Sequence, residues 1–221
     1  MLIFRLFGAG YSSLEVLFAV VAFLLAITIA LVLHEFAHAV VALWWGDPTA
    51  KLAKRVSLNP ARHVEPLGLV FFLLIGFGWA KPVPVNPFNF KNYRWGNFWV
   101  SVSGVIVNAI LAFVFSFGFF MMITFAPLNL WTFGVAYFFG FGLLINIAVA
   151  LFNMLPIPPL DGFNMLASFA KPNNRFMNGM RQSGFIILIL FMLLGGTTML
   201  FWVNDFIQDA LVSFWGWIFR V

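Results

Sequence analysis

The chain has 221 residues, of which 63% are hydrophobic and 9% are charged, and its mean hydropathy is +1.00. Soluble domains are about half apolar and about a quarter charged, so this composition excludes an ordinary soluble domain and predicts an integral membrane protein. The formal net charge of +5 does not indicate nucleic-acid binding, because Lys and Arg fall in short loops between apolar segments. The absence of cysteine excludes disulfides, thiolate ligands and cysteine nucleophiles, so a metal would need histidine, carboxylate or amide ligands.

The first apolar segment is long enough to span a membrane. Residues 1–11 contain one Arg and no small-residue cleavage pattern, so we predict no cleaved signal peptide. Residues 14–45 are predicted to form one helix, ended by the turn signal Gly46-Asp47-Pro48. A basic loop follows.

Residues 67–80 are apolar but too few to cross as a helix, and Gly76 and Gly78 interrupt them. If they crossed, the basic loops on either side would lie on opposite faces of the membrane, against the positive-inside tendency. We therefore predict a re-entrant hairpin, which usually borders a cavity because non-helical backbone at membrane depth needs protein or water around it. A short tilted span is the alternative.

Three further spans are predicted, at residues 97–125, 132–155 and 184–203. The loop at 126–131 contains no Lys or Arg and is placed outside, whereas a basic region precedes the last span. Residues 204–221 place apolar side chains on one helical stripe, which predicts a helix that lies in the membrane interface or packs on the bundle. The predicted fold is an all-α polytopic membrane protein with about four transmembrane helices, a re-entrant segment and this C-terminal helix. We expect one membrane domain over residues 1–221, with a catalytic core at about 14–165.

A candidate metal site lies in the first span, where His34-Glu35-Phe36-Ala37-His38 forms an H-E-x-x-H pattern. Residues four apart share one face of a helix, so both imidazoles can bind one Zn²⁺ while Glu35 lies beside the water. The pattern also occurs by chance on soluble helices, but ionisable residues inside an apolar span are expensive and are functional candidates by default.

A catalytic zinc needs a third protein ligand. The other histidine is His63, and the remaining acids are Glu15, Asp47, Glu65, Asp161, Asp205 and Asp209. The spans at 14–45 and 132–155 both run from outside to inside by the loop charges, so Asp161 meets the histidine pair at one depth. A solvated or loop-bracing role is favoured for the acids and the histidine near the first basic loop. Three prolines in residues 153–162 prevent a regular helix before Asp161, although a simple helix-ending turn is the alternative.

These patterns resemble the site-2 protease family of intramembrane zinc metalloproteases, in its compact prokaryotic branch. The resemblance is carried by the H-E-x-x-H pattern and by residues 153–162, which match the family's N-x-x-P-x-P-x-x-D-G region. Further likenesses lie at residues 46–49, 57–63, 66–68 and 78–87, so the resemblance covers much of residues 33–162.

The resemblance implies that His34, His38 and Asp161 bind Zn²⁺, that Glu35 activates water, and that Asn153 helps to hold the substrate or the developing oxyanion. It also implies cleavage of transmembrane segments in regulated intramembrane proteolysis, for example of membrane-bound transcriptional regulators, or removal of leftover signal peptides. The expected location is a prokaryotic cell membrane, with the active site toward the cytoplasm.

The chain departs from the family at one place. Relatives often have A-G-P-x-x-N, whereas residues 103–108 read S-G-V-I-V-N, so the local helix geometry and any family role of Asn108 stay open. We expect no PDZ or CBS regulatory domain.

The predicted chemistry is metal-assisted peptide hydrolysis with Glu35 as the base and Asn153 as the candidate oxyanion donor. A substrate helix must first unwind or add as a strand, for which residues 67–80 and 81–87 are the candidate places. The expected partners are a transmembrane protein substrate and membrane lipid, not nucleic acid. The competing functions are a divalent-ion transporter that uses the same ligands and a proteolytically silent chaperone or scaffold.

Overall fold

The computed structural model describes residues 10–75, 78, 80–127, 129–171 and 174–221. Among these residues, four helical segments are long and apolar enough to cross a membrane: α2 (Ser13–Trp44), α5 (Tyr93–Phe125), α6 (Leu130–Asn153) and the 45-residue stretch Arg175–Phe219. Short helices connect them: α3 (Thr49–Leu52), η1 (Pro60–Arg62), α4 (Pro66–Ile75), η2 (Pro87–Asn89) and α7 (Asp161–Ala167). The predicted all-α, multi-pass membrane fold is confirmed.

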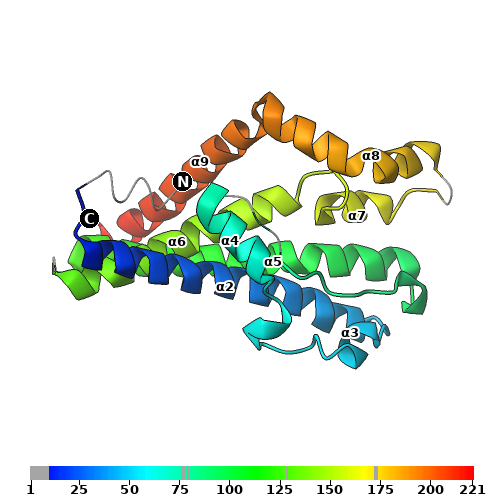
Figure 1. Cartoon of the computed structure of the whole chain (residues 1–221), viewed down its shortest axis with the longest axis horizontal. Helices are drawn as coiled ribbons and strands as arrows, with labels where there is room; N and C mark the ends of the chain where they lie inside the picture. Colours follow the sequence, from blue (N-terminus) through cyan, green and yellow to red (C-terminus); the bar gives the residue numbers. More distant parts are fainter. Residues whose placement is uncertain (1–9, 76–77, 79, 128, 172–173) are drawn as a thin grey trace.

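Helices α2, α5 and α6 form the central bundle, and α5 runs in the direction opposite to the other two (Figure 1). Their starts are set by local capping. Ser12 and Glu15 form a capping box before α2, and the Asn92 side chain accepts hydrogen bonds from the first amides of α5. Asn129 and Thr132 form a capping box at the start of α6.

Small residues let these helices approach closely. Ala19, Ala26 and Ala30 of α2 have no exposed surface and lie about one turn or two turns apart on one face. Gly142 of α6 faces Phe115 of α5, and a Cβ atom at Gly142 would lie 2.2 Å from the phenyl ring. Such contacts replace the hydrophobic driving force that is missing between helices in lipid.

The segment that contains α4 returns to the place where it began. With 10 residues, α4 is about 15 Å long, too short for a hydrocarbon core of about 30 Å. Val64 and Ala80 pair in an antiparallel bridge, and the amide of Lys81 donates to the carbonyl of His63 at 2.8 Å. The two ends therefore lie side by side, which supports the predicted hairpin over a crossing span. Residues 76, 77 and 79 lie outside the described residues.

The C-terminal part differs from the prediction in one respect. The predicted span at 184–203 is broken at Gly195, whose φ of 96° lies in a π-helical turn, Met192–Gly196, between α8 (Arg175–Phe191) and α9 (Thr197–Phe219). The predicted end of the span at 203 is wrong, because α9 continues through it. Glycine permits this kink because it has no Cβ to clash at positive φ. The two arms of the kink form a chevron over the bundle (Figure 1).

Helix α9 packs on the bundle through part of the predicted apolar stripe, while Phe206 and Trp217 of that stripe are exposed. Ile207 and Leu211 of α9 contact the core between α5 and α6, and the indole of Trp215 donates to Ser116 at 2.9 Å. Of the two arrangements predicted for residues 204–221, packing on the bundle is therefore the one that forms.

Asp47 joins the end of α2 to residues 86–89. It is fully buried, its Oδ2 accepts from the amide of Asn86 at 2.7 Å, and its Oδ1 accepts from the Asn89 side chain at 2.7 Å. Thr49 also donates to it. Burial alone would raise the pKa of Asp47, but these hydrogen bonds outweigh burial and hold the pKa below its ordinary value. The carboxylate is ionised at neutral pH and braces the loop, as expected.

Replacing Asp47 by Ala should loosen residues 81–91 without unfolding the bundle. Loss of charged hydrogen bonds worth on the order of 1–3 kcal/mol predicts amide hydrogen exchange about 10–100-fold faster in this loop. Exchange followed by mass spectrometry measures it. Asp205→Ala, which removes an exposed carboxylate from α9, should leave loop exchange unchanged, and equal acceleration in both variants would contradict the bracing role.

Candidate metal centre

The histidine pair lies on one face of α2. His34 and His38 are 4% and 8% exposed, and their ring centroids are 4.6 Å apart. This is the spacing expected of side chains at i and i+4 on a helix, so the sequence pattern and the structure agree.

Asp161 reaches the pair through the proline-rich turn after α6. Helix α6 ends at Asn153, and residues 154–160 are non-helical until α7 begins at Asp161. The next residue, Gly162, lies so close to the end of α6 that a Cβ there would be 2.2 Å from the Met154 carbonyl oxygen. The prolines end the helix and the glycine lets α7 start against it, which supports the interpretation of this stretch as more than a surface turn.

The three candidate ligand atoms converge. Asp161 Oδ2 lies 3.2 Å from Nε2 of His34 and 3.2 Å from Nε2 of His38. The two Nε2 atoms are 3.0 Å apart. Four-coordinate zinc with ligand bonds near 2.0 Å separates its ligands by about 3.3 Å, so the spacing suits a tetrahedral ion.

The other ring nitrogens determine the protonation of this cluster. Nδ1 of His38 lies 2.7 Å from the carbonyl oxygen of Val100, which can only accept, so Nδ1 carries the proton. Nδ1 of His34 lies 2.6 Å from Oδ1 of Asn108. In the neutral imidazoles, which are the form that binds metal, both Nε2 atoms then present lone pairs to each other and to the carboxylate.

Lone pairs that face one another repel unless a cation lies between them. Within the described part of the chain, Asp161 Oδ2 is buried without a hydrogen-bond partner. A buried carboxylate oxygen in that state is costly. The donor set of two imidazoles and one carboxylate leaves a fourth position open and therefore fits a catalytic zinc ion.

Gly104 of α5 leaves the space that the imidazoles occupy. A Cβ at this position would lie 2.5 Å from Cε1 of His34 and 2.7 Å from Nε2 of His38. Gly104 was not predicted as part of the site, although it lies in the S-G-V-I-V-N stretch whose family likeness left the role of Asn108 open. Asn146 was not predicted, because its signal in the sequence was an amide side chain within an apolar span.

Glu35 is tied to the extended loop after α4. Its Oε2 accepts from the amide of Val83 at 2.9 Å. Arg55, 6% exposed, donates to the carbonyl of Lys81 and lies within electrostatic range of Glu35. The neighbour of both metal-binding imidazoles thus contacts the segment predicted to receive a substrate strand.

Two other predicted candidates have local partners. Asn153 is partly buried, and its side-chain amide donates to the carbonyl of Val149 in its own helix at 3.0 Å. His63 is buried, and its Nε2 donates to the carbonyl of Ser57 at 2.6 Å, which is the loop-bracing role that was favoured. Burial lowers the pKa of His63 below its ordinary value, so it is neutral at neutral pH.

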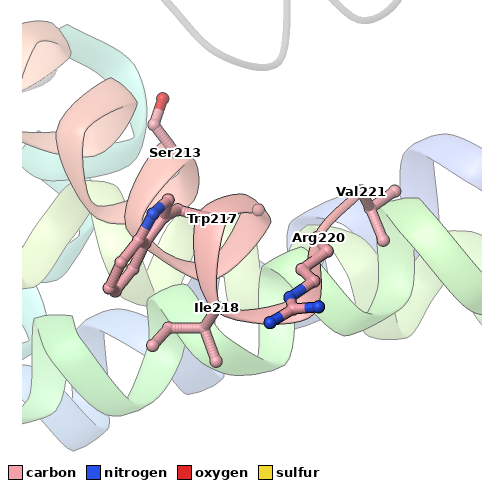
Figure 2. Close-up of a pocket in the computed structure, with 6 residues that line it drawn as sticks. Ser213, Trp217, Ile218, Arg220 and Val221 are labelled. Carbon is pink, nitrogen blue, oxygen red and sulfur yellow. The ribbon is translucent and has the colours of Figure 1, made fainter.

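None of the three candidate ligands lines either of two hollows on the described surface. One, of about 730 Å³, is at the C-terminal end of α9, far from α7 at the opposite end of the bundle (Figures 1 and 2). It is lined by Ser213, Gly216, Trp217, Ile218, Arg220 and Val221. The other, of about 640 Å³, is an apolar groove between α2 and α5 that includes Ala37 and Ser103. The metal centre itself is packed between helices.

Replacing Gly104 by Ala should displace the imidazoles and weaken zinc binding at least about 10-fold, because the added methyl group overlaps both rings. Competition with a chromogenic chelator measures the affinity. Gly179→Ala is the matched control, since a Cβ there has open space. Wild-type affinity in Gly104→Ala would show that the ligands do not occupy the described positions.

Comparison with known proteins agrees with this geometry. The model of "Peptidase family M50" matches residues 22–193. "Putative zinc metalloprotease YwhC" of Bacillus subtilis is 35% identical over 203 residues, which cover 89% of this chain and 91% of that protein. "Putative zinc metalloprotease MJ0611" of Methanocaldococcus jannaschii is 33% identical over 160 residues, covering 71% and 74%. "Putative zinc metalloprotease Rip2" of Mycolicibacterium smegmatis is 28% identical over 204 residues, covering 86% and 76%.

No solved structure matches the chain. The family match includes both histidines and Asp161. The chain therefore belongs to peptidase family M50, the site-2 protease family, and is a membrane-embedded zinc metalloprotease of that family.

Proposed function

We propose that this protein hydrolyses peptide bonds within transmembrane segments of other membrane proteins. The observation that carries the proposal is the convergence of His34, His38 and Asp161 between helices that are themselves long and apolar enough to cross a membrane. A protease site placed there would act on chains that share the bilayer. Two classes of substrate suit such a site: membrane-bound transcriptional regulators, which are cut in regulated intramembrane proteolysis, and leftover signal peptides.

Glu35 is the proposed general base. Zinc, when bound, supplies Lewis-acid polarisation of the water and of the scissile carbonyl group. The Glu35 carboxylate takes a proton from the attacking water as the water oxygen bonds to the carbonyl carbon. It then gives that proton to the amine that leaves when the C–N bond breaks. Its Oε2 accepts from the Val83 amide at 2.9 Å, which helps to hold the carboxylate in place.

Asn153 is the proposed donor to the developing oxyanion. It is the last residue of α6, and Asp161 is the first residue of α7. The proline-rich segment between the two helices therefore has one of these side chains at each end. Its amide donates to Val149 in the free enzyme. In the complex we propose that the amide turns from this carbonyl to the substrate oxygen, where negative charge develops.

The substrate is proposed to bind as an extended strand beside residues 81–87. Transmembrane helices hide their carbonyl groups in hydrogen bonds, so the scissile stretch must unwind. The loop lacks regular helix up to Asn86, and its Val83 contacts the proposed base. An added strand would therefore pass next to Glu35.

The orientation is proposed from loop charge. Lys and Arg concentrate in the segments that follow α2 and α4 and that precede α8, at the end of the bundle where α7 lies (Figure 1). The positive-inside tendency places that end, and the active site, toward the cytoplasm of a prokaryotic cell. We treat residues 1–221 as one membrane domain with its catalytic core at about 14–165.

Glu35→Gln should abolish cleavage of a membrane-embedded reporter helix while zinc binding remains. Loss of a positioned base predicts a rate about 10²–10⁴-fold lower. Purified protein in liposomes with metal analysis measures both quantities. Glu65→Gln makes the same chemical change in the loop before α4 and should keep activity. If wild type binds zinc but cuts no helix in a varied panel, the protease proposal fails; metal flux into vesicles would then indicate a transporter, and no flux would indicate a silent scaffold.

Asn153→Ala should lower kcat by about 10²–10³-fold with little change in KM or zinc content, because an oxyanion donor acts in the transition state. Steady-state cleavage of the reporter helix gives both constants. Asn178→Ala, which removes an exposed amide from α8, is the control. A change confined to KM would assign Asn153 to ground-state substrate binding instead.

A further inference from the structure

We propose that Asn108 and Asn146 are positioning residues that orient His34 and determine which of its nitrogens carries the proton. The inference rests on the proposed role of His34 as a zinc ligand. It assigns a function to two asparagines that lie outside the H-E-x-x-H and proline-rich motifs.

The two amides form an ordered chain that begins at a backbone carbonyl. Nδ2 of Asn146 donates to the carbonyl oxygen of Gly142 at 2.7 Å. Because a carbonyl can only accept, Asn146 must point its nitrogen there and its oxygen toward Asn108. Nδ2 of Asn108 donates to that oxygen at 2.7 Å.

The remaining atom of Asn108 is then an acceptor. Its Oδ1 lies 2.6 Å from Nδ1 of His34, so Nδ1 carries a proton, and in the neutral imidazole Nε2 presents its lone pair to the metal position. The chain from Gly142 to His34 therefore fixes both the orientation of the ring and its tautomer. Metal-binding histidines commonly need such a partner on the nitrogen that faces away from the ion.

The two imidazoles are supported in different ways. Nδ1 of His38 donates to the Val100 carbonyl, a backbone group of α5. The Ser103 hydroxyl also lies 3.3 Å from that nitrogen. Nδ1 of His34 faces the Asn108 side chain instead of a backbone carbonyl, and Asn108 is itself held by Asn146. Substitutions at Asn108 and Asn146 therefore act on the His34 ring, whereas the Val100 carbonyl still holds His38 in each variant.

A structural role as interhelical glue is the competing explanation. Asn108 and Asn146 have no exposed surface, and their hydrogen bond joins α5 to α6. Buried amides in membrane bundles often do no more than this. Asn204 is such a case: it is 2% exposed and donates from α9 to the Leu144 carbonyl of α6 at 3.0 Å, without a link to the ligands. It is the matched control.

The experiment compares zinc affinity in Asn108→Leu, Asn146→Leu, the double variant and Asn204→Leu. Purified full-length protein in detergent competes with a chelator for zinc, and thermal denaturation checks the fold. Asn108→Leu should bind zinc about 10–100-fold more weakly. Asn146→Leu should lose less, and the double variant should be no worse than Asn108→Leu, because Asn146 acts through Asn108.

Two further measurements separate positioning from folding. Asn108→Asp keeps an acceptor for Nδ1 of His34 and should recover zinc affinity to within a few-fold of wild type. The visible spectrum of the Co²⁺-substituted protein should be altered in Asn108→Leu and unchanged in Asn204→Leu, since only the former changes the ligand field.

Three outcomes would overturn the proposal: wild-type affinity in Asn108→Leu, equal losses in Asn108→Leu and Asn204→Leu, or additive losses in the double variant. These readouts do not depend on cleavage. If wild type binds zinc but cuts nothing, the proposed function fails while the affinity series still tests this inference.

Discussion

Two imidazole lone pairs and a carboxylate oxygen meet within about 3 Å of one another inside a helical bundle that fits a membrane. A cation bound between these electron-pair donors would offset their mutual repulsion and the loss of water around the buried carboxylate. The surrounding structure suits such a cation. Each ring donates its outer proton to a buried acceptor, on Val100 or Asn108, so that the inner nitrogens are free to bind metal.

Backbone features supply the space for this cluster. Gly104 leaves room for the two rings on α5, and Gly162 lets α7 start against the end of α6. The intervening residues, with their prolines, turn the chain so that Asp161 faces α2. The geometry of the site therefore depends on these two glycines as well as on the three ligands.

The base and the proposed substrate strand are connected through one loop. Val83 donates to Glu35, while Asp47 anchors the same loop at Asn86 and Asn89 to the end of α2. A single short segment thus joins the helix that carries the H-E-x-x-H pattern to the place where an unwound substrate could pair. Binding of a substrate strand to this loop would therefore affect the position of the Glu35 carboxylate.

Composition, the turn signals and hydrophobic length were sufficient to predict four of the helical segments, because lipid permits few backbone structures. The i, i+4 spacing predicted the histidine pair, and loop charge with the proline-rich turn predicted Asp161, since these depend on local geometry and on which end of the bundle a residue reaches. The kink at Gly195 could not be predicted, because a glycine in an apolar run is equally compatible with a straight helix. For α9, an apolar stripe suits both lipid and protein, so only the tertiary structure decided between the two predicted arrangements. The chain from Gly142 through Asn146 and Asn108 to His34 was also inaccessible. It joins residues far apart in sequence, and only the packing of α2, α5 and α6 decides that their polar atoms meet.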